Sequence, residues 1–170
     1  MAQKPHRALI LLGSNIQRER NIPQAVQMLS KHPELRVVAI SAVYESAAVG
    51  GSRPQPTFSN AAALVETSLQ PSGLRALLRQ METEMGRVRS SDKFAARPID
   101  LDIVLYDDFV GDVDGSRVPD PDLLRYAHVA VPCGEIAPDW VHPSTGQTLK
   151  QISEGVDQRA LRSIPEPPLK

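Results

Sequence analysis

The hydrophobic positions of this chain fall into short runs that predict four main strands. Each run is rich in aliphatic or β-branched residues and is bounded by glycine, proline or polar residues, as strands usually are. The runs occupy residues 7–12, 35–45, 58–67 and 99–106. In the last run apolar and polar residues alternate, so we expect one buried stripe made of Ile99, Leu101, Ile103 and Leu105.

Two segments between these strands have apolar residues at helical spacing. The first has Pro23 in its first turn, Val26 and Leu29 on its apolar face, and Pro33 at its end. The second extends from Pro71 to Gly86, and its apolar face consists of Leu74, Leu77, Leu78, Met81 and Met85. The order β-α-β-β-α-β predicts an α+β, ferredoxin-like fold with an antiparallel sheet. We expect both helices on one face of that sheet and an open face for a ligand.

The chain after residue 106 has weaker patterns and is expected to form a C-terminal extension. Residues 107–117 are typical of a hairpin or excursion, and 119–143 of a proline-rich stretch with a short helix near Glu135. Residues 149–152 are typical of a last turn. We expect a single domain over residues 1–160 and a loose proline-rich tail over 161–170.

Composition narrows the class of protein. The 170 residues are 41% hydrophobic and 23% charged, as in an ordinary globular domain. A net charge of −1 argues against a general nucleic-acid binder, and no apolar run is long enough to predict a membrane span. The N-terminal stretch is too polar for a secretion signal, so we expect a cytoplasmic protein. The single Cys133 excludes an internal disulfide.

Charge is divided between two adjacent blocks. Arginine and lysine dominate residues 75–97, whereas aspartate dominates 100–122. Asp100 and Asp102 point to one face of the predicted strand, roughly 7 Å apart between Cα atoms, and repel each other unless a cation lies between them. Mg²⁺ on such carboxylates, with guanidinium groups nearby, is what a nucleotide polyphosphate requires. The alternative is a pair of solvated, oppositely charged faces.

Six short stretches of the chain match one known family in their order and spacing. They are residues 12–15, 43–46, 55–61, 86–89, 97–103 and 135–138. Through them the chain resembles 6-hydroxymethyl-7,8-dihydropterin pyrophosphokinase, the folate-pathway family that moves a pyrophosphoryl group from ATP to a pterin alcohol. The resemblance extends from about Leu9 to about Ile152. It implies ATP and Mg²⁺ as cofactors. The expected partners are the small-molecule substrates, and neither nucleic acid nor a membrane is expected. We also expect a monomer or weak dimer.

The resemblance also implies roles for individual residues. Asp100 and Asp102 would hold two Mg²⁺ ions, and Arg87 and Arg97 would clamp the triphosphate during transfer. The further positions on the nucleotide side are Arg79, Glu82, Arg89, Phe94, Ile103, Arg117, Asp120 and Arg125. The positions on the pterin side are Ser46, Ala47, Val49, Phe58, Asn60, Asp100 and His128. Without the family context, Phe58 is typical of a core aromatic residue and Asn60 of a turn.

Several positions depart from the family pattern. Phe94 stands where a tryptophan is usual, Asp120 where a histidine contacts the nucleotide, and His128 where an aromatic ring covers the pterin. Arg125 lies one place before the usual arginine. Asp120 near a triphosphate should weaken ATP binding unless a metal ion or Arg117 compensates.

Three classes of function remain open at this point. The chain is a divergent working pyrophosphokinase, or a substrate-shifted or non-catalytic homologue that binds a pterin or nucleotide. The third class, RNA binding on an open sheet, is disfavoured by an aromatic content of 4% and by the acidic strand face.

Overall fold

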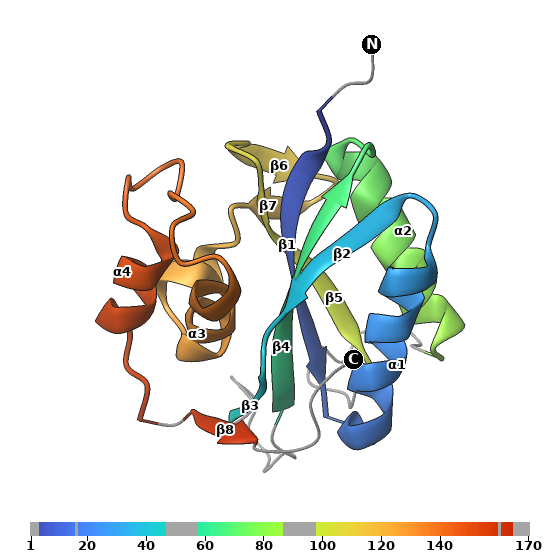
Figure 1. Cartoon of the computed structure of the whole chain (residues 1–170), viewed down its shortest axis with the longest axis horizontal. Coiled ribbons are helices and arrows are strands. Elements are labelled where there is room, and N and C mark those ends of the chain that lie inside the picture. Colours follow the sequence, from blue (N-terminus) through green and yellow to red (C-terminus); the bar gives the residue numbers. More distant parts are fainter. Residues whose placement is uncertain (1–3, 16, 47–57, 87–97, 160, 165–170) are drawn as a thin grey trace.

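The protein, seen in a computed structural model, is a mixed α/β structure with a central antiparallel sheet between two pairs of helices (Figure 1). The structure describes residues 4–15, 17–46, 58–86, 98–159 and 161–164. The strands of the main sheet are β1 (His6–Ser14), β2 (Leu35–Ile40), β3 (Val43–Ser46), β4 (Phe58–Thr67), β5 (Asp100–Tyr106) and β8 (Arg162–Ile164). Their order is β5-β1-β4-β3-β8, and β2 also pairs with β4.

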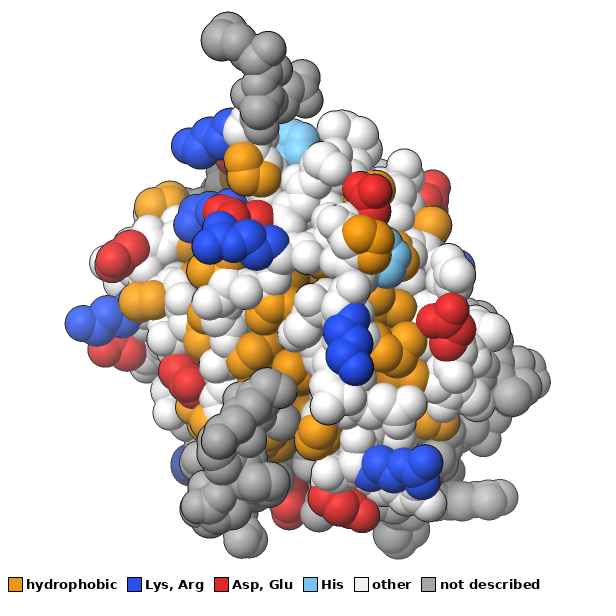
Figure 2. All heavy atoms as spheres, turned by 45° about the vertical axis from the view of Figure 1, so that its right-hand side comes forward, with side chains coloured by type: hydrophobic (Ala, Val, Ile, Leu, Met, Phe, Trp, Pro, Cys, Tyr) orange, Lys and Arg blue, Asp and Glu red, His pale blue; other side chains and the backbone are white. Residues whose placement is uncertain are grey.

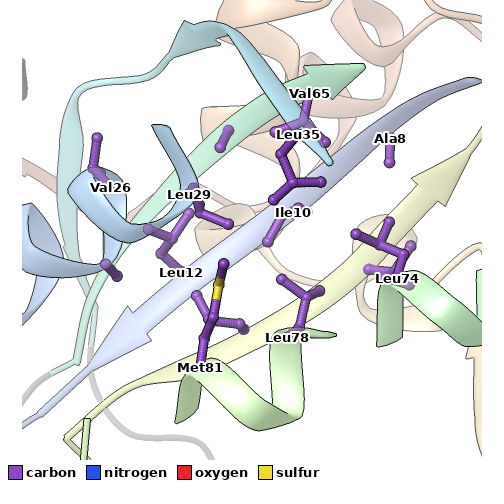
Figure 3. Packing of buried hydrophobic residues seen from close by; sticks show 14 of the residues in the cluster. Ala8, Ile10, Leu12, Val26, Leu29, Leu35, Val65, Leu74, Leu78 and Met81 are labelled. Carbon is purple, nitrogen blue, oxygen red and sulfur yellow. The ribbon is translucent and has the colours of Figure 1, made fainter. Parts of the chain in front are cut away.

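The first pair of helices, α1 (Arg18–Lys31) and α2 (Pro71–Glu84), covers one face of the sheet. Alternate residues of β1 point toward these helices and are fully buried: Ala8, Ile10 and Leu12. Figure 3 shows them packed with Leu29 of α1 and Leu78 of α2. The helical spacing that we identified in both segments therefore predicts the buried faces correctly.

The second pair of helices covers most of the face that we expected to be open. Leu9 and Leu11 of β1 pack in a separate core with α3 (Ala127–Ile136) and α4 (Leu149–Gly155). Both faces of β1 are therefore buried, which explains its continuous apolar sequence. We predicted only a short helix near Glu135 because the segment is rich in proline. The segment nevertheless forms the helix α3, whose apolar residues are buried and which contains Pro132.

A β-bulge in β5 corrects the predicted apolar stripe. Leu9 of β1 pairs with Leu105, but Ile10 pairs with Ile103, so Val104 is an extra residue. An extra residue reverses the direction of every side chain beyond it. Ile103 consequently packs under α1 and α2, whereas Leu105 packs under α3 and α4. The carbonyl of Val104 accepts a hydrogen bond from the backbone N of Asp120 at 3.0 Å.

The run predicted as one strand over 35–45 is divided into β2 and β3. The buried Ser41 causes the break because its side chain replaces part of the strand pairing. Ser41 Oγ accepts from the backbone N of Ala62 at 2.8 Å and donates to the carbonyl of Ala42 at 2.7 Å. β3 therefore runs separately along β4 toward the end of the sheet.

The C-terminal extension contains more regular structure than its patterns indicated. The hairpin expected over 107–117 is confirmed as β6 (Gly111–Val113) and β7 (Ser116–Val118), followed by the 3₁₀ helix η1 (Pro121–Leu124). The predicted last turn is the start of α4, whose first turn has a capping box formed by Thr148 and Gln151. Within the predicted tail, β8 pairs with β3, and residues 165–170 lie outside the described part.

Charged side chains on the face seen in Figure 2 are scattered rather than gathered into one basic patch. This distribution agrees with the net charge of −1. Within the described ranges, no helix is both long and apolar enough to cross a membrane.

Candidate functional site

A pocket of about 190 Å³ lies where one end of the sheet meets η1 and α3. Its walls come from β1, β3, β4 and β5, so segments far apart in sequence contribute to it. Among the described residues that we placed on the pterin side, all five line this pocket: Ser46, Phe58, Asn60, Asp100 and His128. Ala47 and Val49 lie outside the described residues.

Strand register explains the floor of the pocket. Gly13 in β1 pairs with Asn60 in β4 on one side and with Asp100 in β5 on the other. Side chains in such a row project from the same face of a sheet. A Cβ atom on Gly13 would lie 3.3 Å from Asn60 Oδ1 and 3.9 Å from Asp100 Cβ. The bare glycine thus leaves room between an amide and a carboxylate.

The amide of Asn60 is held in a defined orientation at this floor. Asn60 is 3% exposed, and its Nδ2 donates to Ser46 Oγ at 3.0 Å. Ser46 is itself buried at the end of β3, which pairs with β4 at this point. A buried, oriented amide is suited to recognise a ligand edge that carries both a donor and an acceptor.

Glu135 joins two walls of the pocket, and we assigned it no role from the sequence. Its Oε2 accepts from the backbone N of Ala42 at 2.9 Å, and its Oε1 accepts from the hydroxyl of Tyr44 at 2.5 Å. Burial, and secondly the hydrogen bond to Glu135, raise the pKa of Tyr44 to about 12. These bonds connect α3, which carries His128, to β3, which carries Ser46. The signal in the sequence was the match at residues 135–138.

His128 forms a neutral wall of the pocket. Its ring lies beside that of Tyr126, with centroids 5.4 Å apart and an interplanar angle of 23°. Burial lowers the pKa of His128, although the nearby Asp122 opposes this shift. An uncharged, planar ring can pack against a flat heterocycle, which is the role that the family resemblance implies for this position.

Asp100 and Asp102 both line the pocket from β5, as the alternation of that strand predicted. In the described part of the chain, no group of three or more His, Cys, Asp or Glu residues is arranged to hold a metal ion. Mg²⁺ in nucleotide sites is usually bound by one or two carboxylates, with phosphate oxygens and waters completing the shell. The two carboxylates therefore fit a magnesium ion that arrives with a nucleotide.

A second pocket of about 180 Å³ shares Asp102 and Asp120 with the first. It extends away from Asn60 toward the β6–β7 hairpin and α2. The two pockets therefore adjoin at these carboxylates, and we refer to the pair as the elongated site. An extended ligand can occupy both pockets. Its anionic part would then lie beside Asp102, with a cation to neutralise the charge.

Asp120 lies at this junction because of two backbone-directed contacts. Its backbone N donates to the carbonyl of Val104 in the bulge, and its Oδ1 accepts from the backbone N of Asp122 at 2.9 Å. It is thus the N-cap of η1. Burial raises the pKa of the Asp120 carboxyl; the hydrogen bond from the backbone N of Asp122 opposes this shift, and the charge of Asp122 adds to it.

The positions that we assigned to the nucleotide side are distributed over different surroundings. Ile103 and Arg117 line the second pocket together with Asp120. Arg79 on α2 and Arg125 after η1 are exposed, and neither pocket is lined by them. Four of the predicted positions lie outside the described residues: Arg87, Arg89, Phe94 and Arg97.

Glu82 of α2, which the resemblance places on the nucleotide side, lines neither pocket. It is 3% exposed and points into the protein instead of toward solvent. Its Oε2 accepts from the backbone N of Leu101 at 2.8 Å, between the two aspartates of β5. The available backbone donor of another element explains why a carboxylate is buried here. Glu82 supports the strand that carries Asp100 and Asp102.

Comparison with known proteins gives a family match and several similar enzymes. Residues 9–138 match the family 7,8-dihydro-6-hydroxymethylpterin-pyrophosphokinase (HPPK). The 2-amino-4-hydroxy-6-hydroxymethyldihydropteridine pyrophosphokinase of Synechocystis sp. is 35% identical over 94% of this chain and 80% of the relative. The enzyme of the same name from Pseudomonas aeruginosa is 32% identical over 94% of this chain and 97% of the relative. The enzyme of the same name from Bacillus subtilis is 38% identical over 76% of this chain and 77% of the relative.

A solved structure similar to this fold is the wild-type HPPK-DHPS of Plasmodium falciparum. The TM-score is 0.70 at 12% identity, and the match covers 90% of this chain. The chain spans 45% of that longer protein. At this level of identity the likeness shows the fold alone.

Proposed function

Because the chain belongs to the 7,8-dihydro-6-hydroxymethylpterin-pyrophosphokinase family, we propose that the elongated site binds the pterin and ATP and transfers pyrophosphate between them. The acceptor is 6-hydroxymethyl-7,8-dihydropterin, and the products are AMP and the pterin diphosphate of folate biosynthesis. The observation that carries this assignment is the row formed by Asn60, Gly13 and Asp100 beside the junction carboxylates.

The first pocket is assigned to the pterin on chemical grounds. The amide of Asn60 can hydrogen-bond the amide-like edge of the ring, and Phe58 and His128 supply flat walls. Gly13 lets the ring approach the sheet closely. The hydroxymethyl group then points toward the carboxylate end of the pocket.

The phosphates are assigned to the junction of the two pockets. Asp100 and Asp102 are the residues that would hold Mg²⁺, which would supply positive charge to neutralise the phosphates. The pterin hydroxyl attacks the β-phosphorus; its O–P bond forms while the bond from that phosphorus to the oxygen of AMP breaks. The hydroxyl proton is released in this step. Arg87 and Arg97 are proposed to stabilise the charge that develops on the phosphates.

The finer expectations belong to the same proposal. The order of the first five strands and of α1 and α2 supports a ferredoxin-like topology. We include two Mg²⁺ ions, a single domain over residues 1–160, a cytoplasmic location and a monomeric or weakly dimeric state. The number of ions, the domain bounds, the location and the oligomeric state are proposed from the sequence.

The direct test is AMP release from ATP with 6-hydroxymethyl-7,8-dihydropterin and Mg²⁺. We expect AMP and the pterin diphosphate in equal amounts, and no AMP when the pterin is omitted or when EDTA is added. Pterin binding without AMP formation would instead identify a non-catalytic homologue. Absence of both binding and turnover would overturn the proposal.

Gly13→Ala is expected to weaken pterin binding about tenfold, because the new methyl group crowds Asn60 Oδ1. Calorimetric titration of the pterin into the protein measures this change. The matched control is Gly155→Ala, since a Cβ at Gly155 meets no atom within 4 Å and lies away from the site. Equal affinity of both variants would show that the pterin does not approach Gly13.

Asp120→Asn is expected to bind MgATP roughly threefold to tenfold more tightly, because it removes a negative charge beside the phosphates. The amide still accepts from the backbone N of Asp122, so the cap is retained. Fluorescence titration with MgATP measures the effect. Weaker binding would place the nucleotide elsewhere or assign Asp120 a ligand role.

Asp120→Asn should also change how the stability of the protein depends on pH. The folded-state pKa of Asp120 lies above its unfolded value, so its contribution to stability is present at acid pH and is lost as pH rises through the folded pKa. Asp120→Asn should therefore unfold at a higher temperature than wild type at pH 7. The difference should shrink toward pH 4.

A further inference from the structure

Arg75 is the first residue of the basic block over 75–97 and lines the second pocket, and the family resemblance implies no individual role for it. It lies on α2, one turn before the exposed Arg79, and its side chain lines the pocket. Its Nε atom is buried and has no hydrogen-bond partner among the residues that the structure describes. A buried donor without an acceptor lowers the stability of a protein. Such an atom is therefore a candidate to receive its acceptor from a ligand.

The surroundings of Arg75 indicate what that ligand would be. The pocket has an apolar wall that includes Ile103 and Val118, and polar atoms at Ser116. Asp102 and Asp120 enter it from the junction with the pterin pocket. The guanidinium charge of Arg75 offsets the negative potential of these carboxylates, which would otherwise repel an anionic group.

We propose that Arg75 is a nucleotide-positioning residue that donates its Nε–H to the half of ATP that leaves as AMP. The inference rests on the proposed function, because phosphates held at Asp102 direct the nucleoside end into the second pocket. The apolar wall then contacts the base or ribose, and Arg75 anchors an acceptor of the monophosphate half. This contact aligns the α-phosphate, and with it the bond that breaks.

The decisive variant is Arg75→Met, which has similar length but no buried donor. We expect at least a tenfold rise in the dissociation constant of MgATP and of AMP. Pterin affinity measured without nucleotide should stay within twofold of wild type. Because the buried donor has no protein acceptor to lose, the unfolding temperature of the ligand-free variant should be equal to or above that of wild type.

A second variant of Arg75 separates charge from geometry, and a variant of another arginine serves as the control. Arg75→Lys keeps the cation but has no Nε–H, so it should restore only part of the nucleotide affinity. Arg20→Ala removes an exposed arginine of α1 and should bind MgATP as wild type does.

Three results would overturn the inference: unchanged MgATP affinity in Arg75→Met, a matching loss of pterin affinity, or a clear drop in the stability of the ligand-free variant. The last would assign Arg75 a structural role. The experiment also distinguishes this inference from the proposed function. A wild-type protein that binds MgATP through Arg75 but releases no AMP contradicts only the catalytic assignment. A wild type that turns over, with Arg75→Met unaffected, contradicts only the inference.

Discussion

Asp102→Asn is expected to lower kcat for pyrophosphoryl transfer by at least about a thousandfold while the fold is retained. Asp102 lines both pockets and stands at their junction, where we propose that the phosphates bind. Asparagine has almost the same shape but no negative charge, so it is a poor ligand for Mg²⁺. Since Asp102 is only half-buried, the substitution should change the unfolding temperature little.

The measurement is steady-state AMP release at saturating pterin and a range of Mg²⁺ concentrations, together with thermal unfolding. The matched control is Asp108→Asn, an exposed aspartate just beyond the other end of β5, which should retain wild-type turnover. Turnover of Asp102→Asn within tenfold of wild type would rule out the metal-binding role. A large loss of stability in that variant would point to a structural one.

The second large effect is expected for Asn60→Ala, which should weaken pterin binding about a hundredfold and leave MgATP affinity nearly unchanged. The substitution removes the oriented amide from the floor of the first pocket and leaves the polar edge of the ring without partners. Competition binding with a fluorescent pterin measures the first quantity, and nucleotide titration measures the second.

Ser46→Ala separates the contact that the Asn60 amide makes with the pterin from the hydrogen bond that orients this amide. It removes only the hydroxyl that accepts from Asn60 Nδ2, so the amide stays but loses its orientation. We expect a loss of pterin affinity near tenfold, smaller than for Asn60→Ala. If the two variants instead lowered stability equally, without a selective loss of pterin binding, Asn60 would be a core residue.

Local patterns were sufficient for the elements that build the sheet and its first helix layer. The apolar runs of β1 and β4 and the helical spacing of α1 and α2 each reflect burial within a single element. The pair Asp100 and Asp102 was visible for the same reason, because residues two apart on a strand share a face. The match of short stretches added expected roles for residues such as Asn60 and His128, which spacing could not supply.

Other features depended on contacts between elements distant in sequence. The bulge at Val104 reversed Leu105, and its carbonyl positioned Asp120. A backbone donor at Leu101 holds the carboxylate of Glu82 in the interior. The burial of Arg75 Nε likewise became evident only once α2 lay beside the β6–β7 hairpin.

By itself, the sequence determined the apolar strands β1 and β4, the helices α1 and α2 with their buried faces, and where two carboxylates stand together. Periodicity carries this information because side-chain direction repeats within each element. Tertiary structure alone decided the register that sets Gly13 between Asn60 and Asp100, and the packing of α3 and α4 over the second face. Register and packing arise from pairing between elements, and no pattern within one segment specifies the partner that another segment will present.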